Sequence, residues 1–257
     1  IDIDPAEIGK NLSTNIPLVG DIKTTLKELL KRDVLRDDLE RWLKRAQEFK
    51  VTTPSDSAIK GLDPVSILKM ISSKAQPDTI YVTDVGQHQL WAGRNLEITR
   101  PRTFISSGGL GTMGYGLPAA IGVKVANPKK EVVLITGDGS FQMNIAELAT
   151  VAQEDLAVKV IILNNETLGM VREIQQHSYG EKYYGVKLNG NPDFQKLSEA
   201  YGIKGIRVKR QEDVYAKIDE ILSHGKAVVG EFLIDPDANV IPFEREESYE
   251  TNIRRIG

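Results

Sequence analysis

The sequence contains no cysteine, and this excludes several kinds of chemistry. Disulfide frameworks, zinc–thiolate sites, iron–sulfur clusters and thiol nucleophiles all require cysteine. The three histidines, His88, His177 and His224, are not joined by a His-Glu-x-x-His motif. A histidine-rich metal site is therefore not expected.

Long apolar runs and a strong charge of one sign are also lacking. No run approaches the roughly 20 apolar residues of a transmembrane helix, and no signal peptide is visible. The net charge of −3 gives no general attraction to nucleic acid or to anionic membranes. We therefore expect a cytoplasmic protein with no nucleic-acid or membrane partner. Its 257 residues allow one large domain or two modest ones.

The chain opens with Ile-Asp-Ile-Asp-Pro, which alternates like a strand, and it has no initiator Met. We interpret it as a piece of a larger protein or a processed chain; removal of the Met alone is the alternative. The pattern predicts a strand over 1–4 and helices over 22–30 and 37–49. The Thr, Pro and Ser content of 51–61 is typical of a linker. The chain is therefore predicted to consist of a first part of a domain over 1–50, the linker 51–61, a second domain over 62–235 and a polar tail over 236–257.

From Asp63 onward, predicted helices alternate with strands that are apolar on both faces. Asp63 and Pro64 favour the start of a helix, as N-cap and first helical residue. Helices are predicted over 65–74, 118–126, 141–153, 193–201 and 212–222, and strands over 79–83, 131–136, 158–163, 206–208 and 227–234. Such alternation predicts an α/β fold, a parallel sheet with helices on both faces.

Two of these strands run into polar turns. Gly-Asp-Gly-Ser follows the strand that ends at Thr136, and Asn-Asn-Glu-Thr-Leu-Gly follows the strand that ends at Leu163. Ligands bind beyond the carboxyl ends of parallel strands, so neighbouring strands would bring Asp138 and Asn165 together. A carboxylate, an amide oxygen and a loop carbonyl suit Mg²⁺, and a helix beginning at Ser140 points free N–H groups at a diphosphate. Each motif alone is commonly a tight turn; their occurrence at consecutive strand ends favours a binding site.

This pattern resembles the signature of thiamine-diphosphate enzymes, GDG followed by NN after a strand–helix–strand unit. Three blocks resemble the catalytic (large) subunit of acetolactate synthases, also called acetohydroxyacid synthases. They are Asp-Val-Gly-Gln-His-Gln-Leu-Trp at 84–91, Gly-Gly-Leu-Gly-Thr-Met-Gly-Tyr-Gly at 108–116 and Gly-Asp-Gly-Ser-Phe-Gln-Met at 137–143. The similarity covers nearly the whole chain. Its opening resembles the closing segment of that family's middle, FAD-associated domain.

The resemblance implies which residues form the site. Mg²⁺ would be bound by the side chains of Asp138 and Asn165 and by the carbonyl of Thr167. The whole implied cofactor-binding set is Gly86, Gln87, His88, Gly111, Met113, Gly137, Asp138, Gly139, Ser140, Asn165, Gly169 and Met170.

Within this set, the diphosphate would be held by Gly139, Ser140 and the Gln87-His88 loop. Met113 would support the bent cofactor, and the Gly111 carbonyl would meet its aminopyrimidine. Considered alone, His88 is an ordinary loop histidine and Met113 an ordinary core residue; only the surrounding blocks favour a functional role.

Met170, Val171 and Ile174 would face the substrate. The family commonly has Gln-Trp-Gln after Met-Val-Arg, whereas this chain has Glu-Ile-Gln. That Trp favours 2-oxobutanoate as the second substrate, so the preference is open here. The alternative is that Ile174 fills the same apolar space with little effect.

The resemblance also implies the reaction. Pyruvate is decarboxylated and its two-carbon unit is joined to a second 2-oxo acid, giving 2-acetolactate or 2-aceto-2-hydroxybutanoate. This is the first common step of branched-chain amino-acid synthesis, toward valine and isoleucine. The full-length enzyme would bind FAD, form a homodimer or tetramer and accept a regulatory small subunit. Its catalytic Glu would come from an amino-terminal domain that nothing here matches, so we expect the chain to be inactive alone.

Three alternatives stay open at this stage. The chain could belong to another thiamine-diphosphate 2-oxo acid decarboxylase or carboligase. It could be a nicotinamide oxidoreductase, because 109–114 fits G-x-G-x-x-G, but the segment before these glycines is a poor buried strand. The non-enzyme alternative is a cofactor-binding assembly module that pairs with a separately encoded amino-terminal half.

Overall fold

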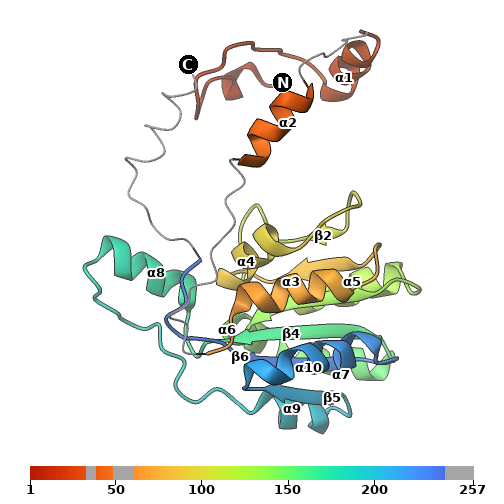
Figure 1. The fold of residues 1–257 in the computed structure, drawn as a ribbon, viewed down its shortest axis with the longest axis vertical. Helices are drawn as coiled ribbons and strands as arrows, with labels where there is room; N and C mark the ends of the chain where they lie inside the picture. The colour runs from red at the N-terminus through yellow and green to blue at the C-terminus, as the bar shows by residue number, and fades with distance from the viewer. Residues whose placement is uncertain (33–38, 49–60, 241–257) are drawn as a thin grey trace. The chain divides into compact units, whose positions relative to one another are not determined.

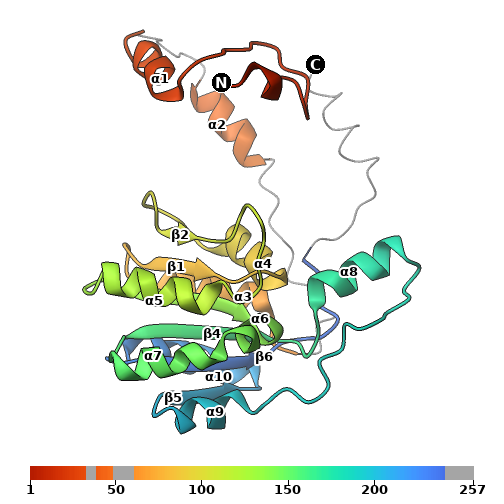
Figure 2. The ribbon, with the colours of Figure 1, turned by 180° about the vertical axis from the view of Figure 1, so that it is seen from behind.

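The computed structural model of the chain describes residues 1–32, 39–48 and 61–240 (Figures 1 and 2). Its contacts divide the chain into two units, Ile1–Thr53 and Pro54–Gly257. Residues 51–60 of the predicted linker lie outside the described residues, as do residues 37, 38 and 49 of the second predicted helix. No described helix is long and apolar enough to span a membrane.

In the described residues of the first unit, 1–32 and 39–48, there are two helices and a short 3₁₀ turn, η1 (Pro5–Glu7). Helix α1 (Ile22–Leu30) begins where the carboxylate of Asp21 accepts a hydrogen bond from the Thr24 amide at 2.8 Å. Helix α2 spans Leu39–Glu48. The predicted strand over 1–4 is wrong, because this segment forms only one parallel bridge, between Asp2 and Val19. No strand of this unit's described residues is there to continue the pairing.

The second unit is built on a six-stranded parallel sheet in the order β2-β1-β3-β4-β6-β5. The strands are β1 (Ile80–Thr83), β2 (Phe104–Ile105), β3 (Val132–Gly137), β4 (Val158–Asn164), β5 (Lys204–Val208) and β6 (Val228–Leu233). All pairs are parallel, so the predicted α/β fold is confirmed.

Helices cover both faces of this sheet. The helices of the second unit are α3 (Pro64–Lys74), α4 (Gln87–Asn95), α5 (Gly116–Ala126), α6 (Asp138–Met143), α7 (Leu148–Gln153), α8 (Gly169–Ser178), α9 (Phe194–Ala200) and α10 (Gln211–Ser223). Helices α3, α4 and α10 pack on one face, and α5, α7 and α9 on the other (Figures 1 and 2).

The two cores follow from the period of two along each strand. On β3, Val133 and Ile135 join the core beneath α3, α4 and α10, whereas Val132 and Leu134 join the core beneath α5, α7 and α9. Both sets of side chains are fully buried. This explains why the strand is apolar at every position up to Ile135 and reads as a continuous run.

The prediction of one continuous helix over 141–153 is wrong, because the helix is interrupted and begins earlier. It is divided into α6, a 3₁₀ turn η2 (Ile145–Glu147) and α7, and α6 begins at Asp138 rather than at Ser140. The break falls at Asn144, whose backbone is not helical and whose side-chain Nδ2 donates to the carbonyl of Gly114 at 2.6 Å. Side-chain bonding of this kind competes with the helical conformation.

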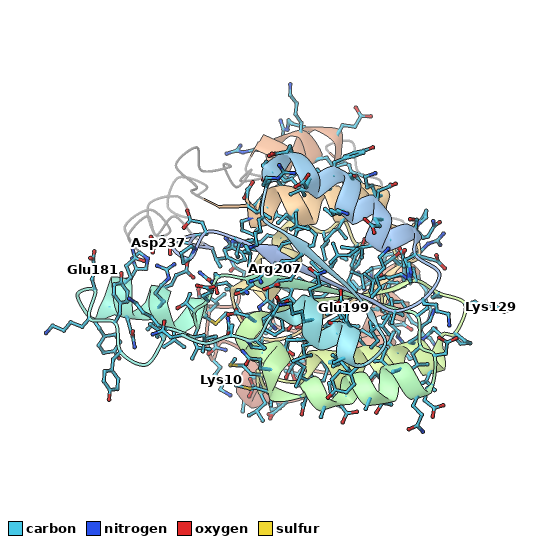
Figure 3. The ribbon with its side chains drawn as sticks, turned by 90° about the horizontal axis from the view of Figure 1, so that it is seen from below. Lys10, Lys129, Glu181, Glu199, Arg207 and Asp237 are labelled. Carbon is cyan, nitrogen blue, oxygen red and sulfur yellow. The ribbon has the colours of Figure 1, made fainter. Side chains whose placement is uncertain are left out.

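Two further interpretations need correction. Gln87 and His88 lie in the first turn of α4 and not in a loop. Residues 236–240 of the predicted polar tail pack against the unit: Val240 is fully buried, and its amide donates to Glu173 on α8. Asp237 of this segment is labelled in Figure 3. The rest of the tail, 241–257, lies outside the described residues.

Candidate functional site

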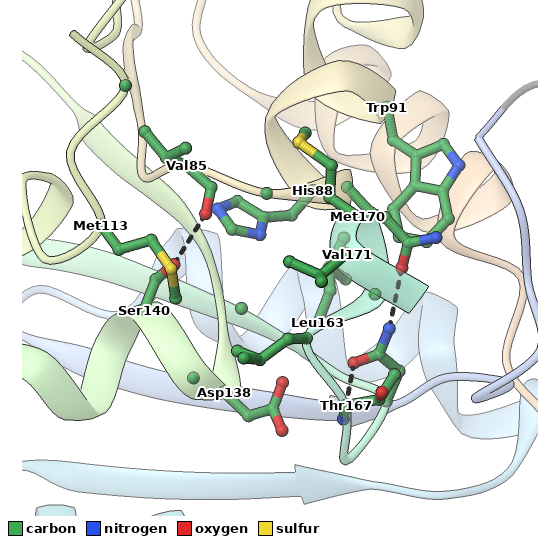
Figure 4. A pocket seen from close by; sticks show the side chains of 18 residues that line it. Val85, His88, Trp91, Met113, Asp138, Ser140, Leu163, Thr167, Met170 and Val171 are labelled. Atoms are coloured by element: carbon green, nitrogen blue, oxygen red, sulfur yellow. Dashed lines mark hydrogen bonds between the residues drawn. The ribbon is translucent and has the colours of Figure 1, made fainter. Parts of the chain in front are cut away.

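A pocket of about 220 Å³ opens beyond the carboxyl ends of the central strands (Figure 4). Its walls come from the turns after β1, β3 and β4, the glycine-rich segment before α5, and the first turns of α4, α6 and α8. The lining residues are Val85, Gly86, Gln87, His88, Trp91, Gly111, Met113, Gly137, Asp138, Gly139, Ser140, Leu163, Asn165, Thr167, Leu168, Gly169, Met170 and Val171.

The structure brings nearly all the sequence-predicted site residues to this pocket. Every residue named for cofactor binding and for the metal lines it, as do Met170 and Val171. Ile174 does not line it: this side chain lies one helical turn beyond Met170 and is 50% exposed. The roles given to these residues stay predictions, because a shared pocket establishes only that they lie together.

Asp138 reaches the pocket because β3 and β4 are neighbours in register, with Gly137 opposite Leu163. Its carboxyl group is 1% exposed, and Oδ2 accepts a hydrogen bond from Asn191 Nδ2 at 2.6 Å. Burial raises the pKa of Asp138 to about 6, and the hydrogen bond from Asn191 partly opposes this rise. A buried carboxylate of this kind gains from a cation beside it.

Asn165 and Thr167 complete the polar side of the pocket. Asn165 Nδ2 donates to Gln87 Oε1 at 2.9 Å, and Asn165 Oδ1 accepts from the Thr167 amide at 3.2 Å. The Thr167 hydroxyl donates to the Val186 carbonyl at 2.9 Å and is therefore already engaged. Among the described residues there is no group of three or more His, Cys, Asp or Glu that could hold a metal. One carboxylate with amide and carbonyl oxygens fits Mg²⁺, which takes its other ligands from phosphate and water.

His88 provides an unpaired nitrogen in the pocket wall. The ring is buried, and burial lowers the pKa of His88 to about 3, so the imidazole is neutral at pH 7. Its Nε2 has no hydrogen-bond partner within the described part of the chain. Leaving a buried polar atom unpaired costs about 1–3 kcal/mol, so its presence in a pocket indicates a ligand.

Glycines leave the room that the pocket occupies. A Cβ at Gly137 would lie 2.9 Å from His88 Nδ1, and a Cβ at Gly169 would lie 1.7 Å from Gln87 Oε1. Gly139 would meet Leu168 and Leu188 at 3.0 and 3.1 Å. Larger residues at these positions would displace the side chains that line the site.

Sequence reasoning missed several residues that support the site. Asn164 Nδ2 donates to Glu231 Oε1 at 2.7 Å, and Glu231 Oε2 lies 3.0 Å from Nε of Arg207, which Figure 3 labels. A polar chain thus runs from the ion pair of the buried Glu231 with Arg207 through Asn164 and Asn191 to Asp138. A charged Glu231 within an otherwise apolar strand was a usable signal, whereas nothing around Asn191 indicated its contact.

A parallel sheet whose central turns enclose a pocket with a mixed oxygen donor set defines an α/β cofactor-binding domain. Residues 84–232 match the family model described as thiamine pyrophosphate enzyme, C-terminal TPP binding domain. The match covers more than half of the chain, and the chain belongs to this family. The family match does not support the alternative of a nicotinamide oxidoreductase. The glycines of the G-x-G-x-x-G motif at 109–114 follow β2, an edge strand of only two residues.

Several curated proteins are about 40% identical in sequence to this chain. The chain is 42% identical to an acetolactate synthase large subunit from Cyanidium caldarium over 94% of its length and 43% of the relative's. It is 43% identical to a probable acetolactate synthase large subunit from Methanocaldococcus jannaschii, over 98% of this chain and 44% of the relative. The acetolactate synthase isozyme 2 large subunit of Escherichia coli is 40% identical to this chain, over 94% of this chain and 44% of the relative. The chain therefore spans less than half the length of these relatives.

Proposed function

We propose that this chain is the thiamine-diphosphate-binding part of an acetolactate synthase large subunit. Such an enzyme decarboxylates pyruvate and joins the two-carbon unit to a second 2-oxo acid, giving 2-acetolactate or its longer homologue. The single observation that carries the proposal is the one pocket into which the Gly137–Ser140 and Asn165–Gly169 turns both open. The family match and the relatives support it.

In this proposal Asp138, Asn165 and the Thr167 carbonyl hold Mg²⁺, and the diphosphate lies against Gly139, Ser140 and His88. His88 is neutral, and its Nε2, the atom that lacks a partner, would be available to the ligand. When bound, thiamine diphosphate supplies the electron sink on which a 2-oxo acid loses CO₂. Met113 and the Gly111 carbonyl would contact the cofactor, and Met170 and Val171 would exclude water on the substrate side.

The proposal extends to parts of the enzyme beyond this pocket. No glutamate is among the residues that line the pocket in the described part of the chain. A glutamate from an amino-terminal domain of a second subunit would therefore complete the site, and the chain alone would be inactive. We further propose that residues 1–50 are the end of a FAD-associated middle domain. The whole enzyme would be a cytoplasmic homodimer or tetramer that can take a regulatory small subunit.

The second substrate depends on the substrate side of α8. Ile174 stands where the family commonly has Trp, and it lies outside the pocket lining with half of its side chain exposed. Only Met170 and Val171 of this helix, beside Gly169, shape the pocket directly. We therefore propose that pyruvate and 2-oxobutanoate are both accepted, with little preference set by Ile174.

A chimera tests the reaction. This chain replaces the matching part of the Escherichia coli isozyme 2 large subunit, and the purified chimera is given pyruvate, thiamine diphosphate, Mg²⁺ and FAD. We expect 2-acetolactate from the chimera, none from the 257-residue chain alone, and none from an Asp138→Ala chimera. Release of acetaldehyde without acetolactate would show instead a simple 2-oxo acid decarboxylase. Acetolactate from the chain alone would contradict the missing glutamate.

A further inference from the structure

Asp84 is a buried carboxylate beside the pocket that the proposed roles leave unused. It directly follows β1 and is 1% exposed, and its amide donates to the Ile135 carbonyl at 3.0 Å. It does not line the pocket. A carboxylate is costly to bury unless hydrogen bonds compensate, so its partners indicate what it does.

Three backbone N–H groups on two separate segments donate hydrogen bonds to the Asp84 carboxylate, and the Ser140 side chain interacts with it as well. Oδ1 accepts from the amides of Val85 at 2.8 Å and Gly114 at 2.9 Å. Oδ2 accepts from the amide of Gly116 at 2.9 Å. One side chain therefore joins the turn after β1 to the glycine-rich segment before α5.

Both joined segments contribute pocket walls. The glycine-rich segment carries Gly111 and Met113, and the turn after β1 carries Val85. Met113 and Val85 are labelled in Figure 4. The carbonyl of Val85 accepts from the Ser140 hydroxyl at 2.8 Å, which connects the same turn to the start of α6. Asp84 thus lies at the point where three walls of the pocket meet.

Two glycines of this segment, Gly114 and Gly116, lie against the Asp84 carboxylate. A Cβ at Gly116 would lie 2.8 Å from Asp84 Oδ2. Gly114 has a φ of +88°, which favours glycine, and its carbonyl accepts from Asn144 at 2.6 Å while its amide donates to Asp84. Gly114, next to Met113, is therefore held from both sides.

We propose that Asp84 is a positioning residue that holds the Gly111–Gly116 segment, and with it Met113, in the geometry that binds thiamine diphosphate. This inference rests on the proposed function of the pocket. An ionised carboxylate only accepts hydrogen bonds, which suits three N–H donors. An asparagine there would turn its NH₂ group toward at least one of these amides and leave that amide without an acceptor.

Asp63 provides a matched control with similar chemistry away from the pocket. It is also buried, at 7% exposure, and its carboxylate accepts from the amides of Val65 at 3.0 Å and Ser66 at 3.1 Å at the start of α3. It does not line the pocket. Asp63→Asn therefore reports the general cost of disturbing a buried carboxylate bound to backbone amides.

The test compares Asp84→Asn, Asp63→Asn and the unmodified 257-residue chain. Thiamine diphosphate affinity is measured by calorimetry at saturating Mg²⁺, and amide hydrogen exchange is measured by NMR without ligand. We expect both substitutions to lower the melting temperature, but only Asp84→Asn to weaken cofactor binding, by about tenfold or more. Only Asp84→Asn should speed exchange at Gly114 and Gly116. Unchanged affinity in Asp84→Asn, or an equal loss in Asp63→Asn, would overturn the proposal.

Hydrogen exchange separates this inference from the proposed function. If the unmodified chain does not bind thiamine diphosphate, the proposed function fails, while the exchange data still show whether Asp84 holds the segment. If Asp84→Asn does not fold, amide hydrogen exchange in the unmodified chain decides whether Asp84 holds the segment. The amides of Gly114 and Gly116 should then be protected, in contrast to Leu110, which is 92% exposed. Equal exchange at Gly114 and Leu110 would refute the role of Asp84.

Discussion

Replacing Asp138 with Asn should stabilise the metal-free chain while it removes Mg²⁺-dependent binding. Burial raises the pKa of Asp138 from 3.8 to about 6 on folding, so the ionised folded chain is destabilised by about 3 kcal/mol. Because the folded state holds the proton more tightly, the free energy of unfolding falls as pH rises from about 4 to 6. Asn carries no charge, and we allow about 1 kcal/mol for a disturbed bond to Asn191. The expected gain at pH 8 is about 2 kcal/mol.

The assay is urea unfolding followed by circular dichroism in EDTA at pH 4, 6 and 8. The gain of Asp138→Asn over the unmodified chain should be present at pH 8 and be lost toward pH 4, where Asp138 of the folded chain is protonated and only the cost of the disturbed bond to Asn191 remains. Asp78→Asn, a surface change with 55% of the side chain exposed, is the control and should change stability little at any pH. A variant that is no more stable than the unmodified chain at pH 8, or a gain in stability that persists in full at pH 4, would refute the reasoning.

Three further substitutions test the packing around the site. Gly169→Ala places a Cβ 1.7 Å from Gln87 Oε1, and calorimetry should show about tenfold weaker cofactor binding. Gly122→Ala, within α5 and with nothing within 4 Å of the new Cβ, is its control and should raise the free energy of unfolding by about 0.5–1 kcal/mol. Glu231→Ala leaves Asn164 Nδ2 without its acceptor and Arg207 with only Asp193, at 3.6 Å, and should cost about 1–3 kcal/mol in urea unfolding. Wild-type affinity in Gly169→Ala, or a loss below 1 kcal/mol in Glu231→Ala, would count against these contacts.

Local pattern was sufficient to predict five of the six strands, all but the two-residue edge strand β2, and the position of the candidate pocket. The strands around Val133 and Val160 are apolar at successive positions because both faces are covered, and this signal is contained in a few neighbouring residues. The turns after β3 and β4 then meet because the strands are adjacent. The resemblance supplied the remaining pocket residues, including His88 and Met113, which no local pattern distinguishes.

Contacts between residues far apart in the sequence were not predictable in this way. Asn191 reaches Asp138 from the segment before α9, and the carbonyl of Ala238 accepts from Gln87 across most of the chain. The break after α6 depends on Asn144 bonding the carbonyl of Gly114, a partner 30 residues earlier. Each of these depends on tertiary packing, which overrides local preference.

Calorimetric titration of the chain with thiamine diphosphate, with and without Mg²⁺, tests the central claim most directly. We expect binding of one cofactor per chain that requires Mg²⁺ and is lost in Asp138→Ala, because this carboxylate is the charged member of the proposed metal site. Binding that is independent of Mg²⁺, or cofactor affinity unchanged in Asp138→Ala, would contradict it.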